Sequence, residues 1–188
     1  NKDADLVAYP KEMTGSYSDY DVIYKGNYLC DIDLPIPGLF NIYNSLAAFG
    51  ASLSLGIGVD QIREGLKNAR QVDGRFEKVP CSQGFDVFVD YAHTPDALSK
   101  ILEEIKKICR RHIIVVFGCG GNRDRSKRAM MGTIASELAD LVIITSDNPR
   151  TEDSGKINKD ILAGVDEKNQ SKFTVEDNRK KAIYLALD

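Results

Sequence analysis

The pattern of apolar and polar residues along the chain changes near residue 75. Before that point, residues 17–29 alternate in a turn-rich stretch, and their segment 25–27 (KGN) predicts a hairpin turn between two strands. Small residues then predict a helix over 41–55, and Asp60 predicts the N-cap of a second helix that ends near residue 69.

After residue 75 the pattern alternates regularly between short apolar runs and amphipathic stretches. The expected elements are strand 85–90, helix 97–110, strand 112–117, helix 126–138, strand 141–145, helix 157–165, strand 173–175 and a last helix from Asn178. Thr94 and Pro95 are typical of an N-cap and a first helical residue. Residues 113–117 are all apolar, which favours a central strand of a parallel sheet. The alternation therefore predicts a doubly wound α/β domain.

Ligands of doubly wound sheets bind beyond the carboxyl ends of the strands, which selects three loops of this chain. In the first of these loops, Asp90 and His93 lie between a strand and a helix start. Such a pair suits contacts to a ribose hydroxyl or to a metal-bound phosphate. A simple capping turn is the alternative.

The second loop, 118–128 (GCGGNRDRSKR), combines glycines with cations. Glycines before a helix N-terminus suit an anion, but position 123 is arginine, so the dinucleotide pattern G-x-G-x-x-G is not met. No G-K-[ST] segment follows either. Arg123, Arg125, Lys127 and Arg128 favour recognition of carboxylates or phosphates, with a solvated helix start as the alternative.

The third loop, 145–151 (TSDNPRT), carries opposite charges on a stiff backbone. Proline restricts Asn148 to extended conformations, which would preset Arg150 for a carboxylate and Asp147 for an ammonium group. An amino acid offers both groups. An Asx-type turn is the alternative for this loop.

Composition narrows the possible partners. The chain has 188 residues, a net charge of -3 and 43% hydrophobic residues, which is ordinary for a globular domain. No basic patch suggests nucleic acid, and no apolar run approaches the roughly 20 residues of a membrane span. Its four cysteines form no C-x-x-C pair, so we expect no zinc site and a reducing cytoplasmic setting.

Five motifs occur in an order that resembles the C-terminal part of the Mur ligase family. They are 38–48 (GLFNIYNSLAA), 73–77 (DGRFE), 89–98 (VDYAHTPDAL), 117–124 (FGCGGNRD) and 146–152 (SDNPRTE). The resemblance implies that residues 1–75 form the end of a central ATP-binding domain. Residues 76–188 would then form a Rossmann-like, doubly wound domain with a mainly parallel sheet that receives an amino acid.

The resemblance also implies roles for individual residues. Those implied to bind ATP are Asn41, Asn44, Arg75, Asp90 and His93. Those implied to bind the amino acid are Arg123, Asp147, Asn148 and Arg150. It assigns no catalytic residue and no metal ligand within this chain.

The implied activity is ATP- and Mg²⁺-dependent amide formation in peptidoglycan-precursor synthesis. An acyl phosphate of a UDP-N-acetylmuramoyl dipeptide would be attacked by the amine of meso-diaminopimelate, whose distal carboxylate suits Arg150. We expect a monomeric cytoplasmic protein. The family's G-x-x-G-K-[TS] and late G-K-G-H-E segments are missing from the sequence, so we expect a fragment that does not ligate alone.

Four other interpretations compete with this one. A folylpolyglutamate or cyanophycin synthetase is disfavoured by the segment 147–150 (DNPR), and a lysine-adding ligase is disfavoured by Arg150. A non-catalytic Rossmann-like binding module is the third. A nicotinamide-dependent oxidoreductase is weakened by the missing G-x-G-x-x-G.

Overall fold

A computed structural model describes residues 4–188, which divide into two compact units. The first unit extends to Tyr91, and the second comprises Ala92–Asp188. The expected domain boundary after residue 75 stays a prediction.

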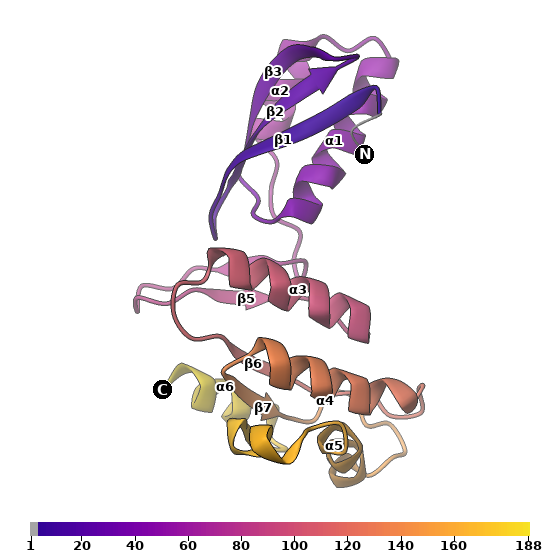
Figure 1. The fold of residues 1–188 in the computed structure, drawn as a ribbon, viewed down its shortest axis with the longest axis vertical. Helices are drawn as coiled ribbons and strands as arrows, with labels where there is room; N and C mark the ends of the chain where they lie inside the picture. Colours follow the sequence, from indigo (N-terminus) through magenta and orange to yellow (C-terminus); the bar gives the residue numbers. More distant parts are fainter. Residues whose placement is uncertain (1–3) are drawn as a thin grey trace. The chain divides into compact units, whose positions relative to one another are not determined.

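An antiparallel sheet and two helices form most of the first unit (Figure 1). The elements are β1 (Leu6–Met13), β2 (Ser18–Tyr24), β3 (Asn27–Leu34), α1 (Leu39–Ser54) and α2 (Val59–Lys67), with strand order β1-β2-β3. The hairpin prediction is confirmed: Lys25 and Gly26 form the turn between β2 and β3 with positive φ angles of 48° and 81°. Strand β1 was not foreseen, because none of its residues is buried and its half-buried and exposed positions do not alternate.

The core of the first unit lies between this sheet and the two helices. Tyr20 is fully buried, and its hydroxyl group lies 2.7 Å from the hydroxyl of Ser45 on α1. The predicted cap of α2 is wrong by two residues. Gly58 is the N-cap, its N–H donates to the side chain of Gln61 at 3.3 Å, and Asp60 lies within the first turn.

A short antiparallel hairpin follows, made of β4 (Glu77–Val79) and β5 (Val87–Val89). The expected strand 85–90 is therefore shorter than predicted, and it pairs antiparallel with β4. Phe76 is fully buried, its ring 4.7 Å from the Phe88 ring and 5.4 Å from the Phe40 ring. This stack holds the hairpin against the start of α1.

The second unit is a parallel sheet with helices, so the predicted α/β class is confirmed (Figure 1). Its elements are α3 (Pro95–Ile108), β6 (Ile114–Phe117), α4 (Ser126–Leu138), β7 (Leu141–Ile144), α5 (Ser154–Leu162), a 3₁₀ helix (Glu167–Lys172), β8 (Phe173–Val175) and α6 (Arg179–Leu187). The strand order is β6-β7-β8. The central strand is thus β7, and the expectation that residues 112–117 form a central strand is wrong.

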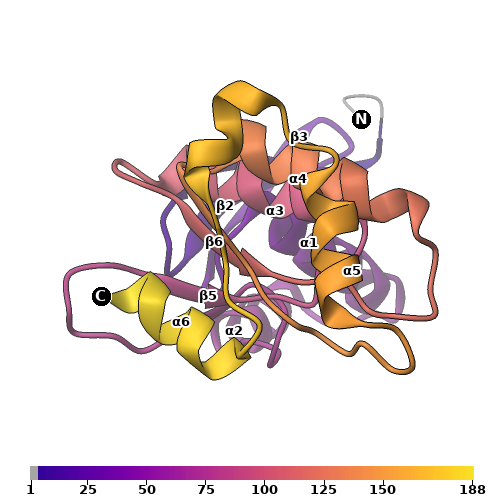
Figure 2. The same cartoon turned by 90° about the horizontal axis from the view of Figure 1, so that it is seen from below.

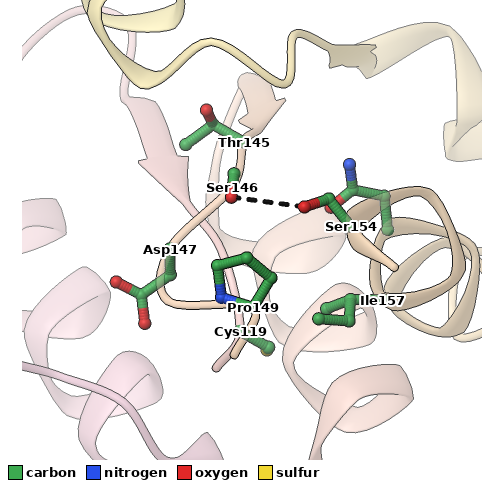
Figure 3. Close-up of a pocket in the computed structure, with 8 residues that line it drawn as sticks. Cys119, Thr145, Ser146, Asp147, Pro149, Ser154 and Ile157 are labelled. Atoms are coloured by element: carbon green, nitrogen blue, oxygen red, sulfur yellow. Dashed lines mark hydrogen bonds between the residues drawn. The ribbon is translucent and has the colours of Figure 1, made fainter. Parts of the chain in front are cut away.

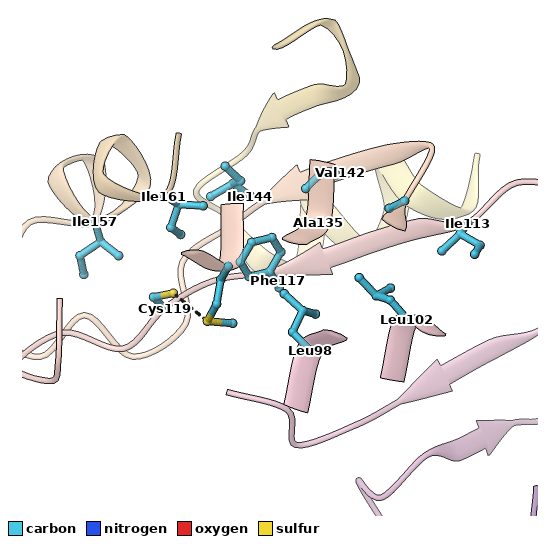
Figure 4. Close-up of a cluster of buried hydrophobic side chains, with 12 residues drawn as sticks. Leu98, Leu102, Ile113, Phe117, Cys119, Ala135, Val142, Ile144, Ile157 and Ile161 are labelled. Atoms are coloured by element: carbon cyan, nitrogen blue, oxygen red, sulfur yellow. Dashed lines mark hydrogen bonds between the residues drawn. The ribbon is translucent and has the colours of Figure 1, made fainter. Parts of the chain in front are cut away.

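Helices α3, α4 and α5 share one apolar core with β6 and β7 (Figure 4). Leu102, Met131 and Val142 from three of these elements are at most 2% exposed. Helix α6 contacts β6 and β7, and Figure 2 shows it on the other side of these strands from α4. The predicted cap of α3 is confirmed, because the Thr94 hydroxyl accepts the N–H of Ala97 at 3.3 Å.

Within residues 4–188, no helix has the length and apolarity that crossing a membrane requires.

Candidate functional site

The loops that follow β6 and β7 are bonded to each other along their length. The Gly121 N–H donates to the Asn148 carbonyl at 2.8 Å. In return, Arg150 Nη1 donates to the Gly121 carbonyl at 2.7 Å. One residue further along each loop, the Thr151 hydroxyl donates to the Asn122 side chain at 3.0 Å. The structure therefore brings the second and third predicted loops together at the carboxyl ends of adjacent parallel strands.

Two glycines allow this close approach. A Cβ atom on Gly118 would lie 2.0 Å from the Thr145 carbonyl oxygen, and one on Gly121 would lie 1.9 Å from that of Pro149. Both contacts are with backbone, which cannot move aside as a flexible side chain can. These glycines thus serve contact between loops rather than the approach of an anion to the backbone.

Two of the four cations of the second loop bind the protein's own carboxylates. Arg128 is fully buried and binds Glu152 at 2.9 Å and Asp160 at 2.8 Å. Arg125 also binds Asp160, at 3.0 Å. The expectation that Arg128 recognises a ligand is wrong, because its guanidinium has no access to solvent.

The other two cations differ from each other. Lys127 donates from Nζ to the His93 carbonyl at 2.7 Å, which ties the first predicted loop to the start of α4. Arg123 is exposed, and among residues 4–188 it has no hydrogen-bond or ion-pair partner. Of the four, Arg123 is therefore the cation most accessible to a ligand.

The side chains of Asp147 and Arg150 both lie close to Gly120. A Cβ placed on Gly120 would be 3.8 Å from Asp147 Oδ2 and 3.2 Å from Arg150 Nη1. Both side chains belong to exposed residues, as does that of Asn148. A carboxylate and a guanidinium thus face solvent a short distance apart, which suits a ligand with an ammonium group and a carboxylate.

The crevice behind Asp147 is not the binding site itself (Figure 3). It is lined by residues of the same loop, by residues of α5 and by Cys119 of the loop after β6, and it is too narrow for a water molecule. Figure 3 shows the Asp147 carboxylate pointing away from Ser154 and Ile157, so it is directed out of the crevice. The hydroxyl groups of Ser146 and Ser154, 3.4 Å apart, close the crevice from the side of α5.

Four of the five residues implied to bind ATP lie in the first unit. Asn41 and Asn44 follow Phe40 on α1, and the Asn44 amide donates to Asn41 Oδ1 at 3.4 Å. Arg75 is exposed beside Phe76, and the Asp90 carboxylate accepts the Phe76 N–H at 2.8 Å.

Further contacts hold this group in place. The Asn41 amide donates to the Pro37 carbonyl at 2.7 Å, and the Arg75 guanidinium lies 5.0 Å from the centre of the Tyr91 ring. His93, in the second unit, is exposed. Residues 4–188 hold no cluster of three or more His, Cys, Asp or Glu side chains suited to a metal ion.

Comparison with known proteins identifies the family. Residues 74–188 match a family described as "Mur ligase, glutamate ligase domain". The chain belongs to the Mur ligase family. The five motifs therefore pointed to the correct family.

Individual Mur ligases resemble the chain over nearly its whole length. It is 46% identical over 185 residues to the "UDP-N-acetylmuramoyl-L-alanyl-D-glutamate--2,6-diaminopimelate ligase" of Clostridioides difficile. The match covers 98% of this chain and 36% of that protein, so the chain spans little more than a third of the relative's length. A solved structure with the same protein name is 31% identical, with a TM-score of 0.68 over 98% of this chain and 37% of the other.

The fold alone is shared more widely. A folylpolyglutamate synthase structure from Thermotoga maritima has a TM-score of 0.76 at 23% identity, covering 97% of this chain and 42% of that one. The fold therefore does not separate the diaminopimelate-adding Mur ligases from this rival.

Sequence reasoning missed two carboxylates of this Mur ligase domain that bind the buried Arg128, Glu152 and Asp160. Glu152 lies inside the fifth motif, and its position two residues after Arg150 was the available signal. Asp160 carried no such signal, because a single acidic residue in a charged helix looks like any solvent-exposed residue in the sequence.

Proposed function

We propose that this chain is part of an ATP-dependent ligase that joins meso-diaminopimelate to UDP-N-acetylmuramoyl-L-alanyl-D-glutamate in peptidoglycan-precursor synthesis. The observation that carries the proposal is the pairing of the two loops, which gathers Arg123, Asp147, Asn148 and Arg150 at one edge of the sheet. Relatives with that protein name, at 46% identity, support the same substrate.

The charges at this edge suit a diamino dicarboxylic acid. Asp147 offers a carboxylate for an ammonium group, while Arg150 and Arg123 offer guanidinium groups for carboxylates. Arg150 uses Nη1 for Gly121, and a guanidinium has five N–H donors, so others remain for a ligand. Lysine lacks the distal carboxylate that such a donor would bind, which favours diaminopimelate.

The residues implied to bind ATP have side chains of the types that bind a nucleotide. The amides of Asn41 and Asn44 suit the edge of an adenine, the exposed Arg75 suits phosphates, and Asp90 and His93 suit ribose hydroxyls or phosphates. ATP supplies the phosphoryl group that activates the substrate carboxylate as an acyl phosphate, and Mg²⁺ would accompany its phosphates. The protein's contribution is to orient the amine toward that carboxyl group.

We place the reaction in the cytoplasm and the ligase as a monomer. Neither assignment depends on the geometry of the loops, and sedimentation of the purified ligase tests the second.

Arg150→Ala in the whole ligase tests the amino-acid site. Loss of a charge-assisted hydrogen bond costs about 1.5–3 kcal/mol, so the KM for diaminopimelate should rise roughly 10- to 100-fold with the KM for ATP unchanged. Arg111→Ala, at an exposed arginine beyond the end of α3, is the matched control and should change neither constant.

Two outcomes would contradict the proposal. Equal increases for both substrates would make the loop structural. Incorporation of glutamate or lysine in preference to diaminopimelate by the unaltered ligase would instead favour a folylpolyglutamate synthetase or a lysine-adding enzyme.

A further inference from the structure

Arg128 is a buried cation that binds the segments following both β6 and β7. Its side chain is 0% exposed, although it sits in the first turn of α4 beside three exposed charged residues. Nη1 donates to Glu152 Oε2 at 2.9 Å and to Asp160 Oδ2 at 2.8 Å. Nη2 donates to Glu152 Oε1 at 2.9 Å and to the Gly120 carbonyl at 3.4 Å. Its two carboxylate partners come from different places, the β7–α5 loop and helix α5.

Glu152 is where the two loops meet. Besides the paired bonds from Arg128, its Oε1 accepts the backbone N–H of Asn122. Arg128 and Asn122 both belong to the β6–α4 segment, whereas Glu152 follows Arg150 by two residues. One carboxylate therefore ties the loop of Arg123 to the loop of Arg150.

Both loops contain a residue in a strained backbone conformation. Asn122 has φ 53° and Arg150 has φ 52°, in the left-handed region that non-glycine residues rarely adopt. Such conformations persist only where neighbouring contacts hold them in place, and they concentrate at functional sites. Asn122 donates its backbone N–H to Glu152 and accepts the hydroxyl of Thr151 at its side chain. Both partners lie within two residues of Arg150.

We propose that Arg128 and Glu152 are positioning residues for the amino-acid site, which hold Arg150 and Arg123 at the spacing required by the carboxylates of the substrate. Neither residue touches the substrate. This inference rests on the proposed function, since it presumes that the loops bind an amino acid.

The matched pair Glu152→Gln and Asp160→Asn separates positioning from mere stability. Each substitution removes one carboxylate charge from the same buried guanidinium, but only Glu152 lies in the amino-acid loop. In the whole ligase, Glu152→Gln should raise the KM for diaminopimelate about tenfold, because small displacements of positioning groups are costly. Asp160→Asn should leave that constant within about twofold, and the KM for ATP should stay unchanged in both variants.

Hydrogen exchange gives a readout that does not need activity. Glu152→Gln should speed exchange of the Gly121 and Asn122 amides, which bond to Asn148 and Glu152, while Asp160→Asn should leave both protected. Thr151→Val is a milder variant at an exposed residue, in case Glu152→Gln folds poorly. It removes the hydroxyl bond to Asn122 and should raise the KM for diaminopimelate about two- to fivefold.

The outcomes also separate this inference from the proposed function. Equal effects of Glu152→Gln and Asp160→Asn on the KM for diaminopimelate, or no effect of Glu152→Gln and Thr151→Val, would overturn the positioning role. If Arg150→Ala raised the KM while those two variants did not, only the positioning role would fall. If Arg150→Ala itself had no effect, the proposed function would fall first.

Discussion

The pKa of Glu152 reflects the groups that bind its carboxylate. The paired bonds from Arg128, followed by the backbone N–H of Asn122, lower the pKa of its carboxyl from 4.5 to about 2. Because the folded protein holds this group ionised, its contribution to stability is complete above about pH 4.5. That contribution is lost as the pH falls toward 2, where the folded form also takes up the proton.

Glu152→Gln should therefore make the free energy of unfolding less dependent on pH in the acid range. We expect the difference in free energy of unfolding between the unaltered chain and this variant to be constant above about pH 4.5 and to shrink between pH 4.5 and 2. Urea titrations at a series of pH values measure it. A difference that stayed constant down to pH 2 would show that the Glu152 charge is not coupled to folding.

Residue-scale predictions from sequence succeeded where the neighbours along the chain decide the structure. Thr94 caps α3 because its hydroxyl reaches an N–H only three residues away. Arg128 could not be assigned in the same way, since its burial depends on Glu152 and Asp160, 24 and 32 residues further along. A buried arginine and a solvated one have the same sequence signature.

At the scale of elements, helices α4 and α5 pack through glycine. A Cβ on Gly132 would lie 2.1 Å from the Ile161 carbonyl oxygen, and one on Gly164 would lie 1.9 Å from that of Ala129. The helices therefore approach more closely than side chains would permit. This contact sets the distance between the helix that carries Arg128 and the helix that carries Asp160.

Gly132→Ala should have two opposite effects on the free energy of unfolding. Helix propensity favours alanine by about 1 kcal/mol, whereas a clash with backbone costs typically 1–3 kcal/mol. We expect a net loss of stability in urea titrations of the chain. Gly65→Ala, in α2 with nothing within 4 Å of the added Cβ, is the control and should gain about 0.5–1 kcal/mol. A gain in both variants would mean that α4 and α5 can separate at little cost.

The sequence located the elements of the second unit well but not their order in the sheet. Helix α4 begins and ends where predicted, because its apolar spacing and flanking loops are local signals. The apolar run ending at Phe117 was interpreted as a central strand, yet β6 lies at one side of β7. An apolar run reports that both faces of a strand are covered, and it carries no information about how many strands lie beside it.

For the whole molecule, the two units have separate hydrophobic cores. One cluster includes Tyr20, Ile42 and Phe49, and the other includes Leu102 and Val142. No residue belongs to both clusters within the described part of the chain. We therefore expect each unit to have its own free energy of unfolding.

Leu102→Ala and Phe49→Ala form a reciprocal test of this separation. Each should cost about 2–5 kcal/mol, because each truncates a side chain at most 2% exposed. In hydrogen-exchange measurements, Leu102→Ala should reduce protection in residues 92–188 and leave β1, β2 and β3 unchanged, and Phe49→Ala should do the reverse. Loss of protection throughout the chain from either variant would show a single cooperative unit.

The burial of Arg128 beside the exposure of Arg123 has a consequence for ionic strength. The screening length of dissolved salt falls from about 10 Å at 0.1 M to about 3 Å at 1 M, and exposed charges lose their attraction first. Added salt should therefore weaken the attraction between Arg123 and an anionic ligand, whereas the bonds of Arg128 to Glu152 should persist. Of two arginines five positions apart, only the exposed one should therefore be sensitive to salt.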